Sequence, residues 1–405
     1  MFDRYRKISV IGLGYIGLPT AALLASKGYM VNGMDVDKNV VETINKGEIH
    51  IVEPDLDAYV RSSVANKKLK AYTEVQPGDV YIICVPTPFH DDAENHTPNV
   101  DYIRAAVDSI APHIKDQDIV ILESTSPVGT TDMIREILNE RGVNASEVYI
   151  AYCPERVLPG KIMTELVDNA RVIGGIDSKS AEVVASFYET FVSGEILKTE
   201  AKTAEMCKLT ENSYRDVNIA FANELSIICD RNGVNVWDLI QLANHHPRVN
   251  ILQPGTGVGG HCIAVDPWFI VSEDPKNSKL IKTARLVNDE KPEWVINKIK
   301  ATADHRNTKK IACLGLSFKP DIDDLRESPA VKVVESLIEQ GYDVSCVEPN
   351  INDHRKFNLV NFKEAINESD VIALLVKHKE FASDNSKKII QQSNFLDFCG
   401  LFKGT

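Results

Sequence analysis

Cys262 lies at the end of a glycine-rich stretch, and the carboxylate of Asp266 follows it four residues later. Residues 255–262 read GTGVGGHC, and glycine at this density suits a backbone that approaches a ligand closely. A thiol in such a loop is a candidate nucleophile, and Asp266 is a candidate activator of water. The alternative is that Cys262 is a small buried side chain, the usual place of an unpaired cysteine, and that Asp266 caps the turn before Pro267.

Lys208 and Asn212 form a second group with chemical potential. They are four residues apart in a segment, residues 203–232, that broadly keeps helical spacing without glycine or proline up to its end, so they share one helix face. A lysine and an amide on one face could stabilise a developing oxyanion. The alternative is a solvated helix face on which Lys208 pairs with Glu205 or Glu211.

The first 35 residues predict a dinucleotide-binding unit. A short apolar strand at residues 7–11 runs into the motif GLGYIG at residues 12–17, and a helical segment and a second strand then end at Asp35. Such glycines allow a tight turn against a pyrophosphate, and an acid at this spacing binds the ribose. Because Asp35 would repel a 2′-phosphate, the sequence favours NAD over NADP. The alternative is a chance glycine-rich turn with a surface aspartate.

Three further apolar strands are expected at residues 80–85, 119–123 and 148–152. They run into segments that contain Thr87, Thr125 and Glu155. Ligands of open parallel sheets bind at the carboxyl ends of the strands, so these three side chains are predicted to face one cleft. Together with the thiol of Cys262, a bound redox cofactor would suit the oxidation of an aldehyde to an acid through a covalent thioester.

A second β/α unit starts at residues 309–320 and lacks the third glycine of the first, and further strands are expected at residues 343–347 and 371–376. The sequence therefore predicts an α/β protein with two Rossmann-like doubly wound domains joined by a long central helix. Three loop cations, Arg248, Lys319 and Arg326, lie near proline. Such cations bind phosphate or carboxylate groups, or form surface ion pairs.

Composition excludes several classes of partner. The net charge of −13 argues against nucleic acid or an anionic membrane surface, and no apolar run reaches the roughly 20 residues that span a bilayer. The eight cysteines show no paired spacing, as expected for thiols in a cytoplasmic protein. No cluster has the spacing of a zinc site, and the adjacent His245 and His246 are not expected to share an ion, so no metal is expected.

These motifs together resemble the UDP-glucose/GDP-mannose dehydrogenase family over nearly the whole chain. The segments that carry the resemblance are residues 12–19 (GLGYIGLP), 124–129 (STSPVG), 154–156 (PER), Lys208 with Asn212, the cysteine loop with Asp266, and residues 319–329. The resemblance implies an NAD-binding Rossmann domain at residues 1–200 and a central helical dimerisation region with the cysteine loop at residues 201–304. It also implies a UDP-sugar-binding α/β domain at residues 305–405, and a homodimer.

The resemblance further implies that C6 of a nucleotide sugar is oxidised from alcohol to carboxylate with two NAD and one water. By position, the catalytic residues would be Cys262 as nucleophile, Lys208 as acid/base or oxyanion partner, and Asn212, Asp266 and Thr125. The cofactor would contact Gly12, Gly14, Tyr15, Ile16, Gly17, Asp35, Thr87 and Thr125. The substrate would contact Glu155, Arg156, Val157, Leu158, Lys208, Asn212, Arg215, His246, Arg248, Gly259, Lys319 and Arg326, and Arg248 could reach the neighbouring subunit.

The expected substrate is a UDP-N-acetylhexosamine. Family members that act on UDP-glucose have a second glutamate where this chain has Pro159, and a lysine where it has Val265. The pattern is most similar to the members that oxidise UDP-N-acetyl-D-mannosamine, although UDP-N-acetyl-D-glucosamine stays open. A two-electron hydroxyacid-type dehydrogenase, which needs no thiol, and a non-catalytic NAD-binding protein are the remaining alternatives.

Overall fold

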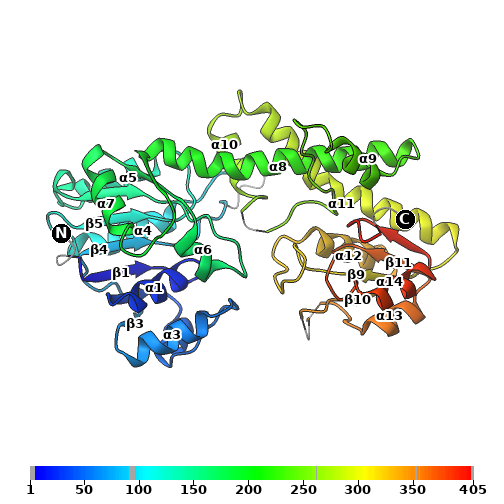
Figure 1. Ribbon diagram of the computed structural model, residues 1–405, viewed down its shortest axis with the longest axis horizontal. Helices are drawn as coiled ribbons and strands as arrows, with labels where there is room; N and C mark the ends of the chain where they lie inside the picture. Colours follow the sequence, from blue (N-terminus) through cyan, green and yellow to red (C-terminus); the bar gives the residue numbers. More distant parts are fainter. Residues whose placement is uncertain (1–4, 91–95, 261, 352–353, 355, 403–405) are drawn as a thin grey trace. The chain divides into compact units, whose positions relative to one another are not determined.

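The computed structural model describes residues 5–90, 96–260, 262–351, 354 and 356–402. The chain divides into two compact units, Met1–Thr210 and Glu211–Thr405, and helix α8 (Ala201–Arg231) runs from the first into the second (Figure 1). This arrangement of two α/β units with a long helix between them in the sequence confirms the predicted fold class.

The first unit is built on a twisted sheet whose strands lie in the order β3-β2-β1-β4-β5-β6-β7-β8. Neighbouring strands are parallel except β6 and β7, which are antiparallel. The strands are β1 (Lys7–Ile11), β2 (Met30–Met34), β3 (Leu69–Tyr72), β4 (Val80–Ile83), β5 (Ile119–Leu122), β6 (Tyr149–Tyr152), β7 (Arg171–Gly175) and β8 (Ile196–Glu200).

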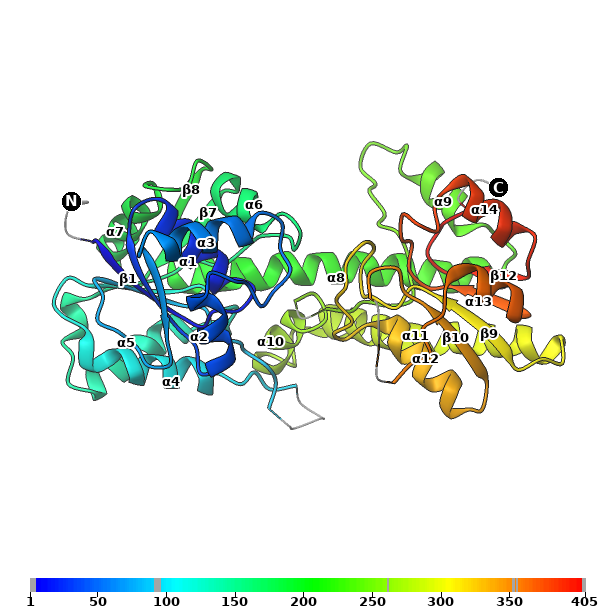
Figure 2. The same ribbon diagram turned by 90° about the horizontal axis from the view of Figure 1, so that it is seen from below.

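Helices cover both faces of this sheet because its strands alternate buried side chains between two cores. In β4, Val80 and Ile82 pack into one core with α1 and α3, and Tyr81 and Ile83 pack into the other with α4 and α5. Figure 2 shows α1 and α3 on one side of the sheet and α4 and α5 on the other. The helices are α1 (Gly17–Ser26), α2 (Lys38–Asn45), α3 (Leu56–Ala65), α4 (Asp101–Ile110), α5 (Thr130–Glu140), α6 (Ile162–Asp168) and α7 (Ser178–Tyr188), with short 3₁₀ turns at Ala111–His113 and Ala145–Glu147.

The second unit contains a parallel sheet in the order β10-β9-β11-β12. Helices α11 and α12 share one core with this sheet, and α13 and α14 share the core on its other face. The strands are β9 (Lys310–Leu314), β10 (Asp343–Val347), β11 (Val371–Leu374) and β12 (Phe395–Asp397). The helices that follow α8 are α9 (Val236–Ala243), α10 (Asp266–Glu273), α11 (Lys279–His305), α12 (Pro329–Glu339), α13 (Phe362–Glu368) and α14 (Asp384–Gln391).

Two features bear on the expected class of protein. Each sheet has a Rossmann-like crossover order, so the carboxyl ends of β1, β2, β4 and β5 meet at one edge in the first unit, and those of β9, β10 and β11 in the second. In the described part of the chain, no helix combines the length and the apolar character that crossing a membrane requires.

Candidate active site

The glycine motif between β1 and α1 is shaped for a close approach by a ligand. Gly12 has φ +90°, and a Cβ there would lie 2.8 Å from the carbonyl oxygen of Cys84. A Cβ on Gly17 would lie 1.8 Å from the carbonyl oxygen of Gly12, whereas one on Gly14 would meet nothing within 4 Å. Packing therefore explains two of the glycines, and Gly14 borders open space at the uncapped start of α1.

Asp35 fixes the same loop from the end of β2. Its Oδ2 accepts a hydrogen bond from the backbone N–H of Leu13 at 3.0 Å, and its Oδ1 accepts from the N–H of Asp37 at 3.0 Å. Tyr15 and Ile16 lie between the glycines, at the entry to α1. An open backbone at Gly14, an uncapped helix start and an acid after the second strand are the features that fit a dinucleotide.

A hydrogen bond joins the segments that follow β4 and β5. The hydroxyl of Thr87 donates to the carbonyl oxygen of Thr125 at 2.6 Å, and both side chains are half-buried. These two predicted residues therefore belong to one edge of the sheet, next to the glycine motif.

Glu155, a predicted substrate contact, has its carboxylate engaged within the protein. Its carboxylate is buried and accepts from Nη1 of Arg171, itself 1% exposed, at 2.9 Å. Its other oxygen accepts from the N–H of Arg156 at 2.6 Å. The carboxylate is thus engaged inside the protein, where an unpaired charge would be costly.

Lys208 is held by the backbone of Glu155. Its ammonium donates to the carbonyl oxygen of Glu155 at 2.8 Å. The alternative pairing of Lys208 with Glu205 does not occur, because the carboxylate of Glu205 is buried and accepts from Gly129 and Thr131 at 2.6–2.8 Å. Lys208 is therefore a half-buried, oriented cation rather than a solvated one.

Glu123, Tyr188 and Cys84 form a buried polar cluster near Glu155, which was not predicted from the sequence. The phenol of Tyr188 donates to Glu123 at 2.6 Å, and Sγ of Cys84 lies 3.3 Å from the other oxygen of that carboxyl group. Burial raises the pKa of Glu123, and the neighbouring charge of Glu155 raises it further. The position of Glu123 at the end of β5 was the one sequence signal for this cluster.

The three residues after Glu155 serve mostly to fix their own segment. Nη1 of Arg156 donates to the carbonyl oxygen of Ala170 at 3.2 Å, and Val157 packs against the core. Leu158 is 37% exposed, and its N–H donates to Glu165 at 2.7 Å. Leu158 is the most exposed of the three predicted substrate contacts.

In the second unit, the structure brings Cys262, Asp266 and Asn212 together. The amide of Asn212 donates to Oδ2 of Asp266 at 2.5 Å, and the N–H of Asp266 donates to the carbonyl oxygen of Cys262 at 2.8 Å. Both Asn212 and Asp266 are buried, whereas Cys262 is exposed. All eight cysteines lie in the described ranges, and Cys262 alone among them is exposed.

The glycine-rich loop before Cys262 packs against protein. A Cβ on Gly259 would lie 2.4 Å from the carbonyl oxygen of Glu327 and 2.7 Å from Pro329, and one on Gly260 would lie 2.9 Å from the ring of Phe318. The density of glycine is therefore explained by close contact with residues 318–329, the segment that carries the predicted cations Lys319 and Arg326.

The loop itself holds the guanidinium of Arg326 and the backbone of Lys319. Arg326 forms a bidentate ion pair with Asp324 at 2.6–3.0 Å, and its carbonyl oxygen accepts from the N–H of Gly260 at 3.3 Å. The carbonyl oxygen of Lys319 accepts from the hydroxyl of Ser317 at 2.7 Å. The predicted cysteine and nucleotide segments are therefore in direct contact.

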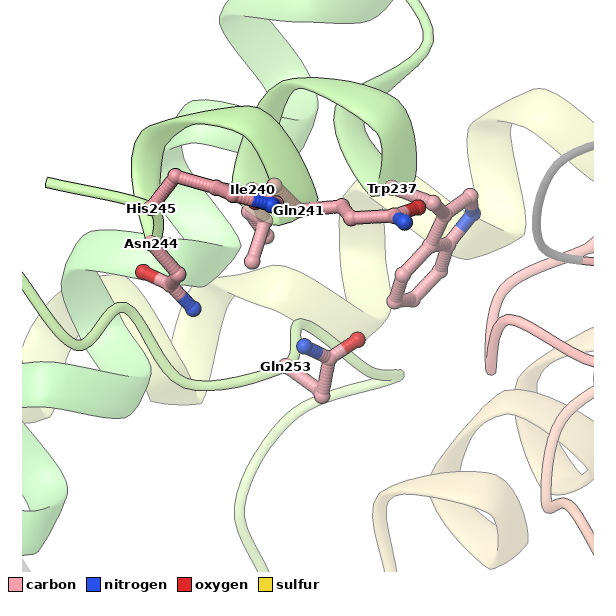
Figure 3. A pocket seen from close by; sticks show the side chains of 6 residues that line it. All are labelled: Trp237, Ile240, Gln241, Asn244, His245 and Gln253. Atoms are coloured by element: carbon pink, nitrogen blue, oxygen red, sulfur yellow. The ribbon is translucent and has the colours of Figure 1, made fainter.

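Arg215, His246 and Arg248 are exposed, and the N–H of Arg248 donates to Nδ1 of His246 at 3.3 Å. His246 and Arg248 follow α9 in the sequence. Residues of α9 and of the segment after it line a hollow, which is formed by Trp237, Ile240, Gln241, Asn244, His245 and Gln253 (Figure 3). This hollow contains none of the predicted site residues, so it does not mark the candidate active site.

One cluster in the second unit has metal-ligating groups. Atoms of Asp321, His378 and Glu380 lie within 4.8 Å of one another. However, Nδ1 of His378 accepts from the N–H of Asp321 at 3.0 Å, and Nε2 faces Glu348 at 3.1 Å. Both ring nitrogens are thus engaged within the protein, which leaves the histidine no lone pair for an ion.

A Rossmann unit with an open glycine-rich loop, followed by a second α/β unit, fits a dinucleotide-dependent oxidoreductase. Residues 6–192 match the NAD binding domain of the UDP-glucose/GDP-mannose dehydrogenase family, residues 202–290 its central domain and residues 312–404 its UDP binding domain. The chain belongs to this family.

Similar proteins carry related names. The chain is 54% identical over 405 residues to the UDP-N-acetyl-D-mannosamine dehydrogenase of Campylobacter jejuni, covering 96% of this chain and 99% of that one. It is 52% identical to the NDP-N-acetyl-D-galactosaminuronic acid dehydrogenase of Ralstonia nicotianae, covering 93% and 92%. The solved UDP-D-ManNAc dehydrogenase of Pyrococcus horikoshii superimposes with a TM-score of 0.89 at 38% identity, covering 98% and 96%.

Proposed function

We propose that this enzyme oxidises C6 of UDP-N-acetyl-D-mannosamine to the carboxylate, with NAD as oxidant and Cys262 as a covalent nucleophile. The observation that carries the proposal is the grouping of the exposed thiol of Cys262 with the buried pair of Asn212 and Asp266. A two-electron oxidation of an alcohol requires no thiol, whereas the second oxidation, from aldehyde to acid, is assisted by one.

The glycine motif and Asp35 would hold NAD, which would supply the hydride acceptor for each of the two oxidations. In the first, the C6 hydroxyl gives up its proton to water as hydride leaves the carbon, which yields an aldehyde, and the ammonium of Lys208 stabilises the charge that develops on this oxygen. Cys262 then adds to the aldehyde carbon to form a thiohemiacetal, and loss of a second hydride converts it to a thioester. Lys208 and Asn212 stabilise the charge on oxygen at each stage.

Hydrolysis of the thioester completes the reaction. Asp266 and Thr125 position a water whose oxygen attacks the thioester carbon, so that the C–S bond breaks and Cys262 regains its thiol or thiolate. One alcohol and one water thereby yield one carboxylate, two reduced cofactors and three protons. Burial of Asp266 and its hydrogen bond from Asn212 support this role.

The nucleotide and sugar are bound by cations around this chemistry. We propose that Arg156, Lys319 and Arg326 bind polar groups of the sugar and the diphosphate, together with Arg215, His246, Val157, Leu158 and Gly259. Glu155 acts through its backbone, which holds Lys208. Gly12, Gly14, Tyr15, Ile16, Gly17, Asp35, Thr87 and Thr125 would contact NAD. We retain the division into residues 1–200, 201–304 and 305–405 as part of this proposal.

We also propose that the enzyme acts as a homodimer through α8. Tyr214, Phe221 and Ile228 recur every seven residues on this helix and are 68%, 52% and 47% exposed. Apolar side chains at this spacing form one stripe, which a second copy of the helix would bury. Arg248 would then be available to the site of the partner.

The substrate assignment rests on Pro159, which replaces a carboxylate found in members that act on UDP-glucose. Loss of a charge suits a bulkier 2-acetamido group, whose amide needs its own polar partners. The deciding experiment measures kcat/KM for UDP-N-acetylmannosamine, UDP-N-acetylglucosamine, UDP-N-acetylgalactosamine and UDP-glucose side by side. We expect the first to be preferred and UDP-glucose to be at least about a hundredfold poorer. Preference for another N-acetylhexosamine would overturn the choice of sugar, and preference for UDP-glucose would also overturn the reading of Pro159.

A further inference from the structure

Glu348 and His378 form a buried pair in the second unit, at the carboxyl ends of β10 and β11. Oε2 of Glu348 accepts from the N–H groups of Leu316 and Ser317 at 2.7 and 3.0 Å, and lies 3.1 Å from Nε2 of His378. Both side chains are fully buried. Burial alone would raise the pKa of Glu348, but the hydrogen bonds from His378 and the backbone outweigh it and lower that pKa.

The other nitrogen of His378 holds the loop that carries the candidate nucleotide-binding cations. Nδ1 accepts from the N–H of Asp321 at 3.0 Å. A backbone N–H can only donate, so Nδ1 carries no proton and the neutral ring carries its proton on Nε2, where it donates to Glu348. The geometry thus selects one tautomer.

Asp321 needs its hydrogen bond to His378 because its backbone conformation is unfavourable for a residue other than glycine. Its φ is +63°, in the left-handed region that costs a residue other than glycine energy. Two hydrogen bonds hold it there, one from its own N–H to His378 and one from the N–H of Lys379 to its carboxylate at 2.9 Å. The turn between Lys319 and Arg326 is therefore fixed from the β11 side.

The same turn contacts the cysteine loop on its other side. The ring of Phe318 and Pro329 pack against Gly259 and Gly260, and the carbonyl oxygen of Arg326 accepts from the N–H of Gly260 at 3.3 Å. A continuous chain of contacts therefore runs from His378 through residues 318–329 to the loop that ends at Cys262.

The two units differ in what surrounds the acid that follows their second strand. Asp35 and Glu348 both follow the second strand of their unit and accept from the loop after the first strand. Asp35 is partly exposed and can face a ribose, whereas Glu348 is enclosed by His378. In the second unit, the acid thus serves the loop and not a ligand.

We propose that His378 is a positioning residue for nucleotide binding: as the neutral Nε2–H tautomer, it holds the Lys319–Arg326 turn in the conformation that receives the diphosphate. This inference rests on the proposed function, because that function assigns the two cations to the nucleotide. It predicts that the Nδ1 acceptor, rather than the bulk of the ring, matters for affinity.

The test uses two variants that each keep one half of the ring's hydrogen bonding. His378→Asn places an amide near Nδ1 and retains an acceptor for Asp321, whereas His378→Gln places its amide near Nε2 and loses that acceptor. We expect His378→Gln to raise the Kd for UDP and the KM for the UDP-sugar at least about tenfold with kcat changed little, and His378→Asn to change both less. His305→Gln, at the exposed end of α11, is the matched control.

The inference is wrong if both variants bind UDP as tightly as the wild type. It is also wrong if both variants lose UDP affinity equally. A lower Tm without a change in UDP affinity would show a purely structural role and overturn it too. Nitrogen-15 NMR of the wild-type ring needs no variant to fold: an unprotonated Nδ1 is expected, and a protonated one would contradict the assignment. If the wild-type enzyme itself fails to bind UDP, the proposed function fails first, which separates the two outcomes.

Discussion

The side-chain amide of Asn212 on α8 donates a 2.5 Å hydrogen bond to the carboxylate of Asp266, the first residue of α10. These side chains are 7% and 3% exposed. The contact sets the orientation of the carboxylate directly after the turn that begins at Cys262, whose carbonyl oxygen accepts from the N–H of Asp266. A thiol, a carboxylate and an amide are thereby held in one local structure.

Asp266→Asn is expected to slow the hydrolysis of the thioester more than its formation. An asparagine keeps the size of the side chain but cannot accept a proton from water, so acyl-enzyme should accumulate. We expect kcat to fall about 10²–10³-fold, with a burst of NADH that approaches two per active site in the first turnover. Rapid-mixing absorbance at the NADH band and intact-protein mass measure both. Steady turnover without an acylated species would remove Asp266 from the hydrolytic step.

Lys208→Ala is expected to lower kcat about 10²–10³-fold with a smaller change in KM, because this cation acts on charge that develops in the transition state. Lys202→Ala is the control, since Lys202 lies on the same helix, is 65% exposed and pairs with Asp132. Steady-state kinetics of both variants decide the role of Lys208. A rise in KM alone would make Lys208 a binding contact.

The glycine motif predicts that the same change has different effects at two of its positions. A Cβ at Gly14 meets nothing within 4 Å, so Gly14→Ala should keep the Tm of the protein without cofactor but weaken NAD binding about tenfold or more. A Cβ at Gly17 would lie 1.8 Å from the carbonyl oxygen of Gly12, so Gly17→Ala should lower the Tm. Calorimetric titration and thermal unfolding measure the two effects. Unchanged NAD affinity in Gly14→Ala would place the pyrophosphate elsewhere.

Lys291 is expected to make stability depend on alkaline pH. Burial lowers its pKa from 10.5 to about 7, although the charge of Asp230 opposes this shift. Between these two values, the unfolded chain binds more protons than the folded one, so the free energy of unfolding rises with pH.

Lys291→Met removes the titrating ammonium, so a comparison with the wild type isolates its contribution to the free energy of unfolding. The stability difference between wild type and variant should grow in favour of the wild type from about pH 7 to pH 10, by at most about 1.4 kcal/mol per pH unit. Denaturant unfolding at several pH values measures it. A difference that stays constant over this range would show that Lys291 keeps its ordinary pKa.

The fold could be predicted where local pattern decides the structure. The expected strands at residues 7–11 and 343–347 agree with β1 and β10, and the long helix agrees with α8 within about two residues. β7 and β8 were missed for physical reasons. β7 ends in Gly174 and Gly175, which weaken a strand pattern, and β8 is a partly exposed edge strand with the sequence ILKTE.

For the site residues too, local patterns could be predicted from the sequence and contacts between distant segments could not. The glycine motif, Asp35 and the spacing of Asn212 are local signals, and the structure gives each a physical reason. The partners of Glu155 and His378 were not predictable, because Arg171, Lys208 and Glu348 come from distant parts of the chain. The glycines before Cys262 predict a loop that approaches a ligand closely, and the structure adds that Gly259 and Gly260 lie close to Phe318 and Pro329, which only the folded chain brings to them.

The number of cofactors reduced per substrate tests the central claim most directly. Wild-type enzyme given a limiting amount of UDP-N-acetylmannosamine should form two NADH per sugar and the C6 carboxylate, as measured by absorbance and product mass. Cys262→Ser should form no carboxylate while it binds NAD normally, because a serine hydroxyl is a far weaker nucleophile than a thiol at neutral pH. One NADH per sugar, or two in the Cys262→Ser variant, would contradict oxidation through a cysteine thioester.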